Sequence, residues 1–245
     1  MTTIFDHLVV LGFAVVWPIV GLFAYRRLVA RVRAGVPGVR FKEYVETTVV
    51  QWAWVAVVLG VWYSHARPAA ALGVRLGTPA QLALGGLLTA GMLTLLYRQW
   101  RQILGLSDVR RLRLKHSLGD TALLLPTTDR EHTAFRVLAV TAGICEEILV
   151  RGYLIWYLAT VIGSWAALVL ASVAFGLAHA YQGRKGIIKT GIVGLVMGVI
   201  YFGTGSLLWP MIIHAAIDLQ GGALGRLTAE TPAAPDGAML SQPST

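Results

Sequence analysis

The sequence predicts an all-α protein, a polytopic bundle of about seven membrane-spanning helices. Of its 245 residues, 56% are hydrophobic and only 13% are charged. An ordinary soluble domain carries about 25% charged residues. The apolar residues also gather in runs about as long as a bilayer is thick. Together with a mean hydropathy of +0.66, these observations exclude an ordinary soluble domain.

Seven segments contain the roughly 20 mostly apolar residues that a helical span needs. In chain order they are Ile4–Tyr25, Thr47–Ser64, Pro79–Tyr97, Thr133–Ala159, Ser164–Ala180, Gly186–Phe202 and Leu207–Leu224. The polar stretch Arg98–His132 separates the third from the fourth, and we expect an interfacial helix around Leu104–Leu114 within it. The apolar stretch Leu118–Leu125 is too short to span alone and leaves an eighth span open.

The distribution of charge predicts the topology. The net charge is +9, and the basic residues stand in short clusters between the apolar runs, as in cytoplasmic loops that face anionic lipid. With the N-terminus outside, 16 of the 21 basic residues fall in inside segments. We therefore expect a multi-pass protein of the plasma or inner membrane with its C-terminus in the cytoplasm. The same pattern argues against a nucleic-acid partner.

The fourth span carries two adjacent carboxylates near its middle. Ionisable residues at membrane depth are costly, so they are functional candidates. Glu147 and Arg151 are four residues apart and can pair on one helix face. Glu146 then points about 100° away and is free to act as a general base on water. The alternative is a purely structural ion network between helices.

Two further spans carry imidazoles. Phe175 and His179 are one turn apart in the fifth span, and His179 is a natural partner for Glu146. His214 and Asp218 share a face of the seventh span and suit a metal site, a proton relay or stabilisation of an oxyanion. Either histidine could instead make an ordinary structural hydrogen bond.

The remaining polar and small residues indicate packing. The first three spans contain almost no buried charge, so we expect them to support the last four structurally. Gly194-x-x-x-Gly198 in the sixth span allows a neighbouring backbone to approach. Cys145, the single cysteine, permits no internal disulfide and suits packing better than nucleophilic chemistry.

Taken together, these clusters resemble the CPBP family, which comprises the type II CAAX prenyl endopeptidases and the bacteriocin-processing (Abi-type) intramembrane proteases. The resemblance lies in three motifs that occur in the family's order, each on an expected span. They are Glu146-Glu147-x-x-x-Arg151 followed by Gly152-Tyr153, Phe175-x-x-x-His179, and His214-x-x-x-Asp218. The resemblance covers roughly residues 126–224.

The resemblance implies a membrane endopeptidase acting on a membrane-associated or CAAX-like protein or peptide, with prenylation left open. By analogy, Glu146 activates water with help from His179, and Glu147 and Arg151 position their helix. His214 and Asp218 would stabilise the oxyanion or hold a metal. Asp218 stands where prenyl-protein members have Asn, and a carboxyl can donate to an oxyanion only when protonated.

Metal dependence stays open at this stage. Glu146, His179 and His214 are the candidate ligands for a divalent metal such as zinc, although the sequence has no H-E-x-x-H motif. We favour a glutamate–water mechanism. The alternatives are a non-catalytic immunity or scaffold protein of the same fold, and a transporter.

The expected organisation has three parts. Residues 1–125 form supporting spans and a basic cytoplasmic loop. Residues 126–225 form the catalytic core, which holds the last four spans. Residues 226–245, rich in Ala, Pro and Ser, form a disordered tail.

Overall fold

The computed structural model describes residues 2–229, and every regular element within them is helical. The all-α prediction is therefore confirmed. The expected tail falls mostly on residues 230–245, which lie outside the described residues. The prediction of disorder is wrong for residues 226–229, because they continue the last helix.

The helices follow the predicted apolar segments, with ends that differ by several residues. In chain order they are α1 (Ile4–Val10), the π-helix η1 (Leu11–Val16), α2 (Trp17–Arg33), α3 (Val39–Ser64), the short 3-10 helix η2 (Ala69–Leu72), α4 (Pro79–Leu104), α5 (Asp108–Ser117), the 3-10 helix η3 (Gly119–Leu124), α6 (Asp129–Glu146), the π-helix η4 (Glu147–Leu154), α7 (Ile155–Ile162), α8 (Ser164–Ala178), the 3-10 helix η5 (Ala180–Gln182), α9 (Gly183–Thr204) and α10 (Leu208–Ala229).

The described residues include four helices that are long and apolar enough to cross a membrane, together with one shorter apolar helix, Ser164–Ala178. The four are Ile4–Arg33, Val39–Ser64, Pro79–Leu104 and Ala180–Thr204. The chain is thus an integral membrane protein, while the count of seven spans stays a prediction. The stretch that left an eighth span open forms only η3, which at about 2 Å per residue is far too short to cross.

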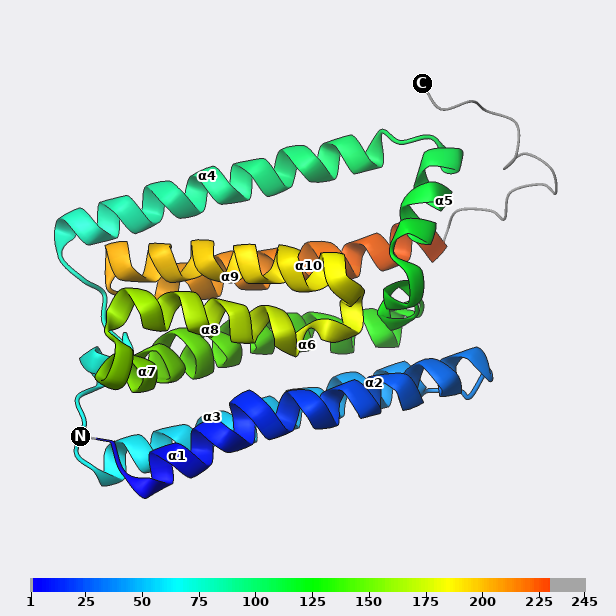
Figure 1. Ribbon diagram of the computed structural model, residues 1–245. Helices are drawn as coiled ribbons and strands as arrows, with labels where there is room; N and C mark the ends of the chain where they lie inside the picture. Colours follow the sequence, from blue (N-terminus) through cyan, green and yellow to red (C-terminus); the bar gives the residue numbers. More distant parts are fainter. Residues whose placement is uncertain (1, 230–245) are drawn as a thin grey trace.

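The long helices run roughly alongside one another and alternate in direction (Figure 1). α6 packs between α3 and α10, α8 packs on α9, and α4 covers α9 and α10. The N-terminus and the described end of α10 lie at opposite ends of the bundle, and α5 lies across the end where α4 finishes (Figure 1). Residues from α3, α6 and α10 can therefore meet in the interior.

The start of α6 is fixed by a capping box. Thr128 Oγ1 accepts a hydrogen bond from the Glu131 N–H at 3.2 Å, and Glu131 Oε2 accepts from the Thr128 N–H at 3.2 Å. The same oxygen also accepts from the Thr127 N–H at 2.8 Å. Burial alone would raise the pKa of Glu131, but these hydrogen bonds and the nearby Arg40 outweigh it and hold the pKa below its ordinary value. The cap anchors the helix that carries Glu146.

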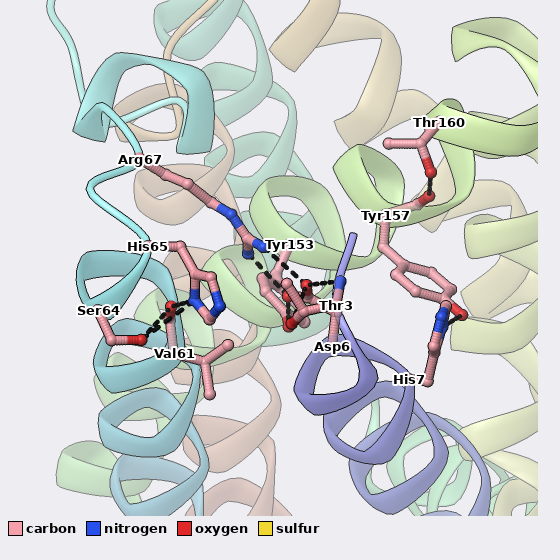
Figure 2. Close-up of polar contacts among 10 residues, drawn as sticks. All are labelled: Thr3, Asp6, His7, Val61, Ser64, His65, Arg67, Tyr153, Tyr157 and Thr160. Atoms are coloured by element: carbon pink, nitrogen blue, oxygen red, sulfur yellow. Dashed lines mark hydrogen bonds and ion pairs between the residues drawn. The ribbon is translucent and has the colours of Figure 1, made fainter. Parts of the chain in front are cut away.

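A buried carboxylate ties the N-terminal helix to the bundle (Figure 2). Asp6 is fully buried and accepts two 2.7 Å hydrogen bonds from the Arg67 guanidinium and one of 2.6 Å from the Tyr153 hydroxyl. The Asp6 carboxylate raises the pKa of Arg67, whose guanidinium carbon also lies 4.4 Å from the centre of a Trp156 ring. The expectation that the first three spans bury almost no charge is therefore wrong at Asp6, which finds its cation in the loop after α3.

Candidate active site

The paired glutamates lie where the backbone changes its hydrogen-bonding pattern. Glu146 is the last residue of α6, and Glu147 is the first of the π-helix η4. A π-helix bonds residue i to i+5 and is frequent at functional sites. The sequence predicted one continuous span here and gave no sign of the wider turn. The helix nevertheless continues into α7, so both glutamates stay on one rigid element.

Glu147 stands at the centre of a buried ion network. Its side chain has no exposed surface, and Oε1 accepts from Arg151 Nη1 at 3.0 Å and from His214 Nδ1 at 2.8 Å. Arg151 also donates to the Gly194 carbonyl at 3.3 Å and lies 4.3 Å from the centre of the Phe175 ring. The predicted Glu147–Arg151 pair is present. Through its contacts with Phe175, Gly194 and His214, it connects the fourth predicted span to the fifth, sixth and seventh.

The contact with Glu147 fixes the orientation of His214. A carboxylate oxygen only accepts, so Nδ1 must carry a proton and Nε2 must face the other way. Nε2 lies 3.9 Å from Glu146 Oε2 and 3.6 Å from Asp218 Oδ2. The imidazole therefore stands between the two adjacent glutamates and presents one nitrogen to each.

Glu146 is held from a helix that sequence reasoning did not assign to the site. Gln51 of α3 donates from Nε2 to Glu146 Oε1 at 2.8 Å. Glu146 Oε2 is buried and has no hydrogen-bond partner within residues 2–229, although 22% of the side chain is exposed. A polar amide in the middle of an apolar span was the available signal for Gln51.

His179 lies beside this network rather than within it. Its Nδ1 donates to the Phe175 carbonyl at 2.8 Å, and its ring lies 4.8 Å from the Phe175 ring. Phe175 in turn makes an edge contact with His214 at 6.0 Å. Over the described part of the chain, no ion pair within 4.0 Å joins His179 to a carboxylate. The structure thus brings Glu146, Glu147, His214 and Asp218 into one group, and Phe175 contacts both His214 of that group and His179.

A glycine allows α10 to approach closely enough for this group to form. A Cβ atom at Gly143, one turn before Glu147, would lie 2.7 Å from the backbone nitrogen of Ala215. Real Cβ atoms essentially never come so near another heavy atom. Because Ala215 follows His214 directly, the size of residue 143 sets how near His214 lies to the glutamates.

The predicted metal ligands do not form a metal site in this arrangement. Within residues 2–229, no group of three or more His, Cys, Asp or Glu side chains is placed to hold a metal ion. One nitrogen of His214 already faces Glu147, and Nδ1 of His179 is bonded to the Phe175 carbonyl.

Residues 131–220 match the family described as type II CAAX prenyl endopeptidase Rce1-like. The match confirms the family resemblance. It covers well under half of the chain and includes every motif residue from Glu146 to Asp218, whereas Asp6, Gln51 and Arg67 lie outside it. No curated protein and no solved structure matches the chain. The Rce1-like match implies a membrane-embedded protease.

Proposed function

We propose that the protein is an intramembrane endopeptidase in which Glu146 activates the water that attacks the peptide bond. The observation that carries this proposal is the 3.9 Å separation of Glu146 Oε2 and His214 Nε2, with Glu147 bonded to the opposite nitrogen of the same ring. Hydrolysis of an amide needs a base that takes a proton from water and a nearby donor that stabilises the oxyanion, and these two atoms lie close enough to serve one peptide bond.

The reaction follows from the position of each group. Glu146 Oε2 takes a proton from water while the water oxygen bonds to the substrate carbonyl carbon, and the carbonyl oxygen becomes an oxyanion. Nε2 of His214, when protonated, donates to that oxyanion. The C–N bond then breaks, and the proton held by Glu146 passes to the leaving nitrogen, giving a carboxylic acid and an amine.

The other motif residues support these two. Glu147 and Arg151 hold the His214 ring, and Phe175 packs between the ring and Arg151. Asp218, 3.6 Å from His214 Nε2, is placed to orient the imidazole and, as a carboxylate, cannot donate to the oxyanion. His179, whose Nδ1 is bonded to the Phe175 carbonyl, acts through Phe175 or on the substrate.

The substrate class comes from the family match. We propose a membrane-associated protein or peptide with a CAAX-like C-terminus, cleaved with or without a prenyl group. The test uses protein reconstituted in vesicles and an internally quenched peptide that ends in a farnesylated Cys-a-a-X sequence. We expect Glu146→Gln to lose at least about a hundredfold in rate, as removal of a general base does.

Glu46→Gln on α3 is the matched control, because it makes the same carboxylate-to-amide change at an exposed residue. Wild-type turnover by Glu146→Gln would refute the mechanism. If the wild type leaves the farnesylated peptide intact, comparison of membrane proteomes from cells with wild type and with Glu146→Gln decides the substrate. A protein that accumulates uncut only in the variant identifies it.

The orientation in the membrane is also a proposal. The basic loops favour an N-terminus outside and a C-terminus inside, and the two ends of the described chain lie at opposite ends of the bundle (Figure 1). Protease protection of terminal tags in sealed vesicles tests it, and two tags digested from the same side would overturn it.

The alternative function is a non-catalytic membrane immunity or scaffold protein. It is favoured by the almost complete burial of Glu147 and Arg151, since a purely structural network would look the same. Under this alternative, variants of Glu146 and His214 would lose stability or a partner, and their wild-type parent would hydrolyse nothing.

A further inference from the structure

Gln51 is a buried amide in the second predicted span. It is 9% exposed and lies where an unbonded amide would be costly. Its Nε2 donates to Glu146 Oε1 at 2.8 Å. With Glu146 ionised, the reverse orientation would set two acceptor oxygens against each other, so the Gln51 amide presents its N–H to Glu146.

The helix that carries Gln51 is locked against α6 beside this contact. The next residue, Trp52, donates from its indole nitrogen to Thr141 Oγ1 at 3.3 Å. Two turns earlier on α3, the Tyr44 ring packs edge-on against Phe135 of α6 with centroids 5.2 Å apart. Contacts at two levels fix how α3 and α6 lie against each other, so the Gln51 amide meets Glu146 in one geometry.

We propose that Gln51, which lies outside the matched segment, is a positioning residue for Glu146. This inference rests on the proposed function. The amide occupies Oε1, and the carboxyl plane then leaves Oε2, the oxygen beside His214 Nε2, to receive the proton from water.

The other groups around Glu146 cannot replace this contact. His214 and Asp218 face it from α10, and Glu147 and Arg151 belong to η4. Tyr181 of η5 interacts with it only through space, and Cys145 is its chain neighbour. Among the described residues, the hydrogen bond recorded for the Glu146 side chain is the one from Gln51.

The experiment compares Gln51→Met and Gln51→Asn with wild type and with Thr48→Val. Met has nearly the shape of Gln but no donor. Asn keeps the amide and withdraws it by one methylene, so it separates loss of the contact from loss of polarity. Thr48, on the same helix, bonds only to the Tyr44 carbonyl within α3 and serves as the control. Unfolding of all variants in detergent shows which remain folded.

The first readout needs no substrate. A hydrophobic carbodiimide such as dicyclohexylcarbodiimide modifies protonated carboxyl groups, and peptide mapping by mass spectrometry assigns the adduct to Glu146. Because the Gln51 amide covers Oε1 of Glu146, we expect Gln51→Met and Gln51→Asn to label roughly tenfold faster at neutral pH, and Thr48→Val to label like wild type. Unchanged labelling in folded Gln51→Met would overturn the proposal.

The second readout is the farnesylated-peptide assay. We expect both Gln51 variants to lose roughly ten- to hundredfold in kcat with little change in KM, because the contact orients the base and does not bind substrate. A wild-type kcat in Gln51→Met, with Glu146→Gln inactive, would overturn this inference alone. An active Glu146→Gln would instead overturn the proposed function.

Discussion

Breaking the buried Glu147–Arg151 pair gives the sharpest test of the energetics of this core. The two side chains are 0% and 2% exposed and lie 3.0 Å apart. Removing one partner of a buried pair costs about 3–5 kcal/mol, because the other charge is left uncompensated. Glu147→Gln keeps an oxygen that can accept from Arg151 but removes the negative charge that balances the buried guanidinium, so we expect a loss near the upper end of that range.

The reverse change should cost less. Arg151→Met leaves Glu147 still bonded to His214 at 2.8 Å, and we expect a loss near the lower end. In the double variant neither charge remains alone, so the combined loss should fall short of the sum by about 1–3 kcal/mol.

The assay is reversible unfolding in mixed micelles, followed by circular dichroism across a titration with dodecyl sulfate. Glu46→Gln, which breaks the exposed Lys42–Glu46 pair, should change the free energy of unfolding by less than about 1 kcal/mol. Strictly additive losses in the Glu147 and Arg151 variants would refute the reasoning, because they would show that the two charges do not stabilise each other.

Three further predictions concern the scaffold around the site. Gly143→Ala should cost about 1–3 kcal/mol of unfolding free energy and lower activity, because the added Cβ pushes α10 away. Gly221→Ala is the control and should not destabilise, because a Cβ there meets nothing within 4 Å. Equal unfolding curves for the two variants would contradict the close approach of α10 at Gly143. Asp6→Ala should cost about 3–5 kcal/mol because it removes the buried carboxylate to which Arg67 and Tyr153 both donate, whereas Tyr153→Phe should cost only about 1–2 kcal/mol. Unfolding in detergent that ranks Tyr153→Phe as the more costly change would contradict this order. The pKa of Glu131 is lowered in the folded protein, so the ionised side chain stabilises the fold fully above its ordinary pKa. That contribution is lost as the pH falls through the pKa of the folded state. Glu131→Gln should therefore destabilise the protein at neutral pH and flatten the acid side of a curve of unfolding free energy against pH.

The helical membrane fold could be predicted from the sequence because bilayer thickness dictates the length of apolar runs. Seven such runs anticipated the long helices, and α5 appeared close to the expected interfacial helix. The family could also be predicted, since three short motifs fall in order on three helices and the family match covers them. Both predictions use local patterns: the fold follows from the hydropathy of each apolar run, and the family follows from the spacing of residues along single helices.

The rest depends on contacts between helices, which no local pattern encodes. The π-helix η4 begins at Glu147, which bonds to both Arg151 and His214, and the sequence there has the pattern of an ordinary helix. Asp6 lies near the start of the first predicted span, and its partner Arg67 stands in a loop 61 residues later in the chain. Gln51 belongs to no motif, and only the packing of α3 on α6 brings it to Glu146.

Access, rather than hydrogen bonding, decides which of the two adjacent glutamates is suited to be the base. Glu146 and Glu147 each have an Oε2 atom without a partner within residues 2–229, so unused acceptor capacity does not distinguish them. Glu147 has no exposed surface and neutralises Arg151, whereas 22% of the Glu146 side chain is exposed. Part of the Glu146 side chain is therefore open without the loss of an ion pair, although Oε2 itself is buried. The charges run from Arg151 through Glu147 and His214 to Glu146, so the more exposed of the two adjacent glutamates lies away from the buried Glu147–Arg151 pair. A proton can be taken up and returned there while that pair stays intact.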